Sequence, residues 1–168
     1  MKKFLPVIVC GFVAGVLNIV PIVKGLSCCL IIPAAAFFSL LLDAKANNNR
    51  EIIKASKAVA FGLLTGIFAA LFGTLLDVLI IFITRNSDLV AGLPELQKLI
   101  SEYPKSSVMT ELTNLLYRIA DEISKYGFSA IYTFMMLFGN LIVNSIFGMV
   151  GGIIGMQILN NRLRNGKQ

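Results

Sequence analysis

The chain has 168 residues, of which 57% are apolar and only 14% are charged, and its mean hydropathy is +0.81. A soluble domain needs charges on roughly a quarter of its residues to cover its surface, so the composition excludes a water-soluble fold. The net charge of +6 comes from basic residues at the ends of apolar segments, where they act as topology signals. The pattern shows no basic patch for a nucleic acid.

The first apolar run covers residues 4–23, which is the length that a helix needs to cross roughly 30 Å of hydrocarbon. The pattern is interrupted around Lys24, and a second run over 26–42 predicts the other arm of a helical hairpin. Pro33 lies inside this second run, where proline removes a backbone donor and crowds the preceding turn. The second segment is therefore expected to cross fully, to be kinked, or to be re-entrant.

Two longer apolar runs follow a polar loop, and they cover residues 58–84 and 128–159. Both exceed the length of a perpendicular span, so the helices should tilt or protrude. The segment 86–127 between them contains apolar residues at spacings of three and four, namely Leu112, Leu115, Leu116, Ile119 and Ile123. This spacing predicts an amphipathic helix that rests on the bilayer or caps the bundle.

The expected fold is therefore all-α: a single integral membrane domain over 1–168 that forms a four-helix transmembrane bundle, with the amphipathic segment between the third and fourth spans. Cytoplasmic segments of membrane proteins carry an excess of lysine and arginine. With four spans, both termini share a side with the loop 44–57, and this side carries nine of the fifteen basic residues: Lys2, Lys3, Lys45, Arg50, Lys54, Lys57, Arg162, Arg164 and Lys167. We expect both termini in the cytoplasm and 86–127 outside.

Glycines and polar residues mark one face of each of the last two spans. On the third span the face contains Gly62, Gly66, Ala69, Gly73 and Asp77, and on the fourth it contains Asn140, Asn144, Gly148, Gly151 and Gly155. An antiparallel register would pair Asp77 with Asn140, Gly73 with Asn144, Ala69 with Gly148, Gly66 with Gly151 and Gly62 with Gly155. Small residues at such faces permit close helix packing, either within one chain or between copies of it.

Asp77 is the only acidic residue inside a predicted span. A carboxylate in lipid is expensive unless it is paired, so we expect a structural partner in Asn140 or in Lys24, which the topology places on the same side. The alternative is an ion-coupling site, because intramembrane acids mark proton and cation pathways. Asn18, Asn140 and Asn144 are expected to form interhelical hydrogen bonds.

The sequence predicts no catalytic, cofactor-binding or metal-binding residue. It contains no histidine, which is the commonest general base and metal ligand. Cys28 and Cys29 are adjacent, and with Cys10 they cannot complete a tetrahedral zinc set. The chain shows no nucleophile and base pair and no phosphate-binding loop, so we expect it not to be an enzyme.

The hairpin formed by Leu17–Val23 and Cys28-Cys29, followed after a polar loop by residues 62–67, resembles small four-helix bacterial membrane proteins grouped as domains of unknown function. The resemblance covers about half of the chain and implies a bacterial inner-membrane location with no assigned activity. The function that best fits these features is an accessory, scaffold or assembly subunit, with membrane lipids and other membrane proteins or a second copy as partners. The alternative is a small oligomeric transporter or channel that uses Asp77 and the intramembrane asparagines.

Overall fold

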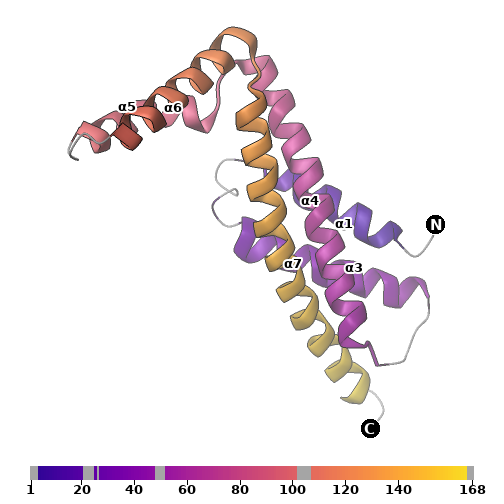
Figure 1. Ribbon diagram of the computed structural model, residues 1–168. Coiled ribbons are helices and arrows are strands. Elements are labelled where there is room, and N and C mark those ends of the chain that lie inside the picture. The colour runs from indigo at the N-terminus through magenta and orange to yellow at the C-terminus, as the bar shows by residue number, and fades with distance from the viewer. Residues whose placement is uncertain (1–3, 21–24, 26, 48–51, 102–106, 166–168) are drawn as a thin grey trace. The chain divides into compact units, whose positions relative to one another are not determined.

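The computed structural model describes residues 4–20, 25, 27–47, 52–101 and 107–165. In this part of the chain all regular structure is helical, with six α-helices and one short π-helix (Figure 1). The all-α prediction is therefore confirmed. The chain divides into two compact units, of which the first contains Met1–Leu76 and Leu137–Gln168 and the second contains Asp77–Met136.

Helix α1 (Leu5–Leu17) is shorter than the first predicted span. Its 13 residues extend about 20 Å, which is less than the hydrocarbon thickness of about 30 Å. The helix ends in tighter turns: the Asn18 N–H still bonds to the Ala14 carbonyl in the α-helical pattern, whereas the N–H groups of Ile19 and Val20 bond to carbonyls three residues back. A proline at position 21 disfavours helix in the residue before it and would not extend the helix.

The second apolar run forms a π-helix, η1 (Ser27–Ile31), that continues directly into α3 (Ile32–Ala46). Pro33 is the second residue of α3, and because η1 leads directly into this helix, the missing N–H of the proline leaves out one helical hydrogen bond. The wider π turn lies immediately before it, which is how helices commonly absorb such an interruption. The stretch Cys29–Ala46 remains apolar and long enough to cross a membrane.

Helices α4 (Ala55–Thr84) and α7 (Ala130–Asn165) have 30 and 36 residues and are also apolar enough to cross a membrane. Together with Cys29–Ala46 they make three candidate spans in the described part of the chain. The predicted count of four spans is not confirmed, because the first run yields only the short helix α1. Helix α7 begins two residues later than the predicted span 128–159. It also ends later, because its last turns are polar and lie beyond the apolar run.

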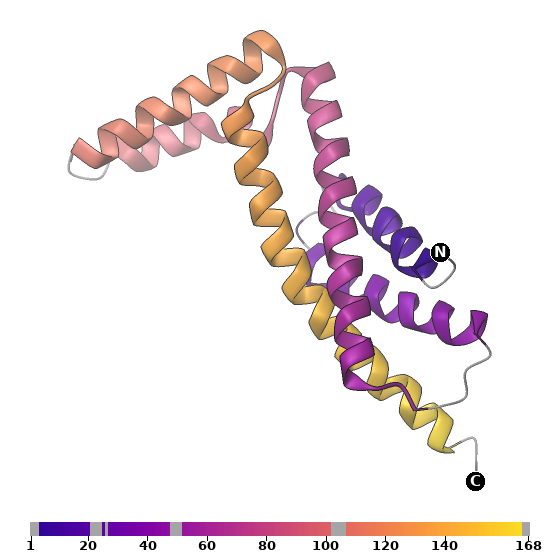
Figure 2. The same cartoon turned by 45° about the vertical axis from the view of Figure 1, so that its right-hand side comes forward.

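Within the first unit, α1 and α3 lie side by side and run in opposite directions; α1 packs obliquely against α4, and α3 also packs against α7 (Figures 1 and 2). Small side chains let the backbones approach. Ala14, Ile32 and Ala69 form one buried cluster, in which α1, α3 and α4 meet. A second cluster joins the same three helices to the end of α7 and contains Val7, Leu40, Ile53, Ala58, Phe61 and Leu159.

The second unit contains α5 (Asp88–Ser101) and α6 (Ser107–Tyr126), between the end of α4 and the start of α7. Its core consists of Ile81, Ile119 and Ile123, packed against Leu89, Val90 and Tyr132. Gly127 ends α6 with a positive φ of 71°, and a side chain there would lie 2.7 Å from the Phe82 carbonyl oxygen. Glycine is therefore required for both its conformation and its lack of a Cβ atom.

Candidate functional site

Helices α4 and α7 approach each other closely at four glycines, Gly62 and Gly66 on α4 and Gly148 and Gly152 on α7. A Cβ atom added to Gly62 would collide with the backbone carbonyl of Gly148, and one added to Gly66 would collide with that of Asn144. A Cβ atom added to Gly152 would likewise collide with the backbone carbonyl of Ala58. Because the residue number falls on one helix as it rises on the other, the two helices run antiparallel.

The register of this contact differs from the predicted one. Gly62 lies against Gly148 rather than Gly155, and Gly66 lies against Asn144 rather than Gly151, which is a shift of seven residues. The expected register is therefore wrong. A shift of seven residues is about two helical turns, so it presents nearly the same face of each helix to its neighbour.

The other glycines of the two predicted small-residue faces contact α1 and α3. Gly151 lies against the backbone of Pro33, and Gly155 lies against Phe37, both in α3. Gly73 faces α1, with Gly15 and the amide of Asn18 about 3.7 Å from the position that a Cβ atom would take. The small faces of α4 and α7 thus serve three helix contacts rather than one.

Three asparagines and a threonine place polar groups inside the first unit. Asn140 Nδ2 donates a hydrogen bond to Thr74 Oγ1 at 3.0 Å and so links α7 to α4. Asn18 is buried at the end of α1. Asn144 is also buried, and its Nδ2 donates to no acceptor among the described residues. Hence the structure places a hydrogen bond at Asn140 and an unsatisfied donor one turn further along α7.

These two asparagines should respond differently to leucine. Asn144→Leu is expected to leave thermal stability unchanged or to raise it, because it removes a buried donor that has no partner. Asn140→Leu is expected to destabilise by roughly 1 kcal/mol, because Thr74 loses its interhelical bond. Thermal unfolding of both variants in the same detergent tests this difference, and a larger loss for Asn144→Leu would contradict it.

A charged pair that the sequence did not indicate connects α3 and α4. The carboxylate of Asp43 is only 4% exposed and lies 2.5 Å from Lys57 Nζ. Asn47 Nδ2 donates to Asp43 Oδ1 at 2.9 Å, and the Lys57 ammonium also lies 5.4 Å from the centre of the Phe61 ring. One turn away along α3 and about two turns away along α4, the buried hydroxyls of Ser39 and Thr65 are hydrogen-bonded at 3.1 Å.

The sequence feature that could have predicted this pair is a carboxylate at the end of one apolar run and a lysine just before the next. A short loop brings such ends together, so the two charges lie on facing helices at the same depth. Asp77 belongs to the second unit and has an interaction partner, and its ion-coupling role stays a prediction. Lys24 lies outside the described residues.

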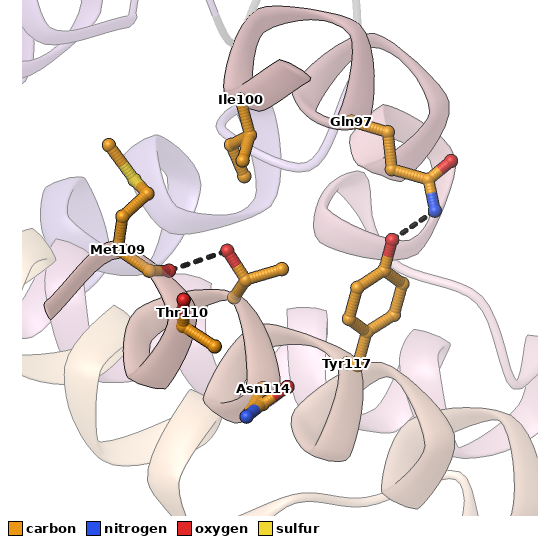
Figure 3. Close-up of a pocket in the computed structure, with 7 residues that line it drawn as sticks. Gln97, Ile100, Met109, Thr110, Asn114 and Tyr117 are labelled. Atoms are coloured by element: carbon orange, nitrogen blue, oxygen red, sulfur yellow. Dashed lines mark hydrogen bonds between the residues drawn. The ribbon is translucent and has the colours of Figure 1, made fainter. Parts of the chain in front are cut away.

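In the second unit a groove of about 340 Å³ lies between α5 and α6 (Figure 3). Its lining surface is mostly apolar, and it also contains uncharged polar groups; the lining consists of Gln97, Ile100, Met109, Thr110, Thr113, Asn114 and Tyr117. Gln97 Nε2 donates a short hydrogen bond to Tyr117 Oη across the two helices (Figure 3). The groove therefore offers hydroxyl and amide groups and no charged side chain among its lining residues.

A separate face of α6 leaves apolar side chains in solvent. Val108, Leu112 and Leu115 share one face at spacings of four and three, and they are 73%, 49% and 37% exposed. Ile119 and Ile123 continue the same face but are buried in the core of the second unit. The predicted apolar stripe is thus covered over its second half only.

The described residues form an all-helical protein with three helices that are long and apolar enough to cross a membrane. In the described residues no group of three or more histidine, cysteine, aspartate or glutamate side chains could hold a metal ion. No family model, no curated protein and no solved structure matches this chain.

Proposed function

We propose that this small integral membrane protein acts as an accessory, scaffold or assembly subunit that binds another membrane protein through helix contacts. The observation that carries the proposal is the exposed half of the apolar face of α6, formed by Val108, Leu112 and Leu115. Exposed apolar residues at helical spacing are the usual anchors when a helix docks on a partner helix. The half that faces Ile81 is already used for packing within the unit.

Charge favours a protein partner over the bilayer surface for this face. Helices that lie on anionic membranes are rich in lysine and arginine on their polar side. Helices α5 and α6 instead carry five acidic residues against three basic ones, and two of the basic residues are already paired, Arg118 with Glu122 and Lys125 with Asp121. Asp121 raises the pKa of Lys125 through this hydrogen bond and its charge. The partner surface that fits is an apolar helix flanked by basic residues.

Photo-crosslinking in living cells tests this proposal. A photoreactive amino acid at position 112 is expected to form an adduct with a protein, whereas one at position 121 is expected not to, because these positions lie on opposite sides of α6. Leu112→Gln combined with Leu115→Gln should reduce recovery of the same partner, and because both side chains are exposed the fold should persist. Adducts with lipid alone at position 112 would contradict the proposal.

The basic end of the first unit, which holds the last turn of α3, the start of α4 and the end of α7, is proposed to face the cytoplasm. In the described residues this end carries Lys45, Lys54, Lys57, Arg162 and Arg164 against Asp43. An excess of lysine and arginine is also the reason why we expect both termini in the cytoplasm. Bacterial inner-membrane residence stays part of this proposal.

One observation favours the transporter or channel as a second candidate. Asn144 has a buried donor without an acceptor, and unsatisfied polar groups inside a membrane often belong to a substrate path. A transporter would show flux in liposomes that Asn144→Leu abolishes while stability is kept. An accessory subunit would show no flux in either protein.

A further inference from the structure

The basic end of the first unit contains a groove of about 470 Å³ that neither the packing core nor the α6 face uses. Its lining changes from apolar to polar along α7, from Met156 to Gln157, Asn160, Asn161 and Arg164, and Ile52 from the segment before α4 completes it. The groove therefore lies where the apolar surface of α7 gives way to its polar last turns. Phospholipid headgroups occupy this depth in a bilayer.

The floor of the groove is fixed by two reciprocal hydrogen bonds. Asn160 Oδ1 accepts from the Ile53 N–H at 2.9 Å, and Asn160 Nδ2 donates to the Ile53 carbonyl at 3.1 Å. These bonds hold the extended segment 52–54 against α7, beside the start of α4. Because Asn160 is used in this way, the amides of Gln157 and Asn161 and the guanidinium of Arg164 are the lining groups that face a ligand.

The charge that lines the groove favours an anion. Lys57 is paired with Asp43, whereas Arg164, the one cationic lining residue, has no acidic partner among the described residues. A guanidinium binds phosphate through two parallel hydrogen bonds, and amide groups supply further donors. The groove thus combines one cation with two uncharged donors, which is a suitable set for a phosphodiester.

An apolar row continues from the groove along the same face of α7. Ile146, Val150 and Ile153 recur at spacings of four and three and are all exposed, and Met156 follows by three residues. An acyl chain could lie along this row while its headgroup occupies the polar end. A soluble phosphate would gain nothing from these side chains, so the row favours a lipid as the source of the anion.

We propose that this groove binds an anionic phospholipid, with its phosphate against Arg164, Asn161 and Gln157 and one acyl chain along Ile153, Val150 and Ile146. The site is independent of partner docking on α6, because it lies in the other unit. The neutral glycerol backbone would contact Met156 and Ile52.

Native mass spectrometry of the full chain with phosphatidylglycerol or phosphatidylcholine of the same acyl composition tests the site. Wild type is expected to retain phosphatidylglycerol preferentially. Arg164→Gln should weaken this binding about tenfold, which corresponds to the loss of one charge-assisted hydrogen-bonding group. Arg162→Gln is the matched control, because it removes the same charge from an exposed position that does not line the groove.

A second variant separates the site from general attraction between charges. Asn161→Ala keeps the net charge and removes a lining donor, so it should also weaken phosphatidylglycerol binding while Arg162→Gln leaves it within about twofold. Equal loss in the two arginine variants, no preference for phosphatidylglycerol in wild type, or displacement of the lipid by inorganic phosphate would each overturn the proposal.

Discussion

Gly66→Ala is expected to destabilise the protein, whereas Gly73→Ala on the same helix is expected to be neutral or stabilising. A Cβ atom at position 66 would collide with the Asn144 carbonyl oxygen and lie 2.6 Å from its carbon. These are main-chain atoms of α7 and cannot rotate away. The nearest atom to a Cβ atom at position 73 is the Gly15 carbonyl oxygen at 3.6 Å, which is ordinary contact.

The two substitutions should therefore differ clearly in their effect on the free energy of unfolding. Overpacking a close helix contact typically costs 1–3 kcal/mol, so about 2 kcal/mol is expected for Gly66→Ala. Gly73→Ala gains up to about 1 kcal/mol of helix propensity, because alanine restricts the unfolded chain. Thermal unfolding in detergent measures both changes.

Gly139→Leu provides a control on α7. Apart from the adjacent residues and the backbone of α7 itself, no atom lies within 4 Å of the position that a Cβ atom would take, and the glycine is exposed. Leucine there should be tolerated, whereas Gly148→Leu should prevent α4 and α7 from approaching. Comparable losses at positions 139 and 148 would mean that the contact seen between Gly62 and Gly148 does not determine stability.

Hydropathy and residue spacing predicted the helical class and the three long apolar helices, because each of these depends on local composition. They could not predict how far α1 extends. Residues 4–23 are apolar apart from Asn18, yet the helix ends at Leu17, and after it the N–H groups of Ile19 and Val20 bond to carbonyls three residues back instead of four. Hydropathy measures preference for lipid and does not record where backbone hydrogen bonds stop.

The register between α4 and α7 shows a second limit of sequence reasoning. Spacing correctly places Gly62 and Gly66 on one face, but a seven-residue shift returns nearly the same face to the neighbouring helix. Which register forms depends on the other contacts of each glycine. Gly151 and Gly155 contact α3, so they are not available to α4.

Lys57→Met is expected to destabilise the protein more than Asp43→Leu does. The methionine variant leaves the Asp43 carboxylate, which is only 4% exposed, with Asn47 as its one remaining partner. Removing one member of a buried pair costs several kcal/mol, and partial exposure of Lys57 reduces this to about 2 kcal/mol. Asp43→Leu leaves a lysine that is 37% exposed and can turn toward water, so its cost should be below about 1 kcal/mol.

The double variant Asp43→Leu with Lys57→Met should recover most of the stability that Lys57→Met alone loses. Replacing both charges with apolar side chains removes the desolvation penalty together with the attraction, and such replacements of buried pairs are often neutral or stabilising. A double-mutant cycle in one detergent, with unfolding temperature as the readout, measures the coupling between the two residues. If the losses simply add, Lys57 stabilises the fold through its contact with the Phe61 ring rather than through Asp43, because only the first contact is independent of the carboxylate.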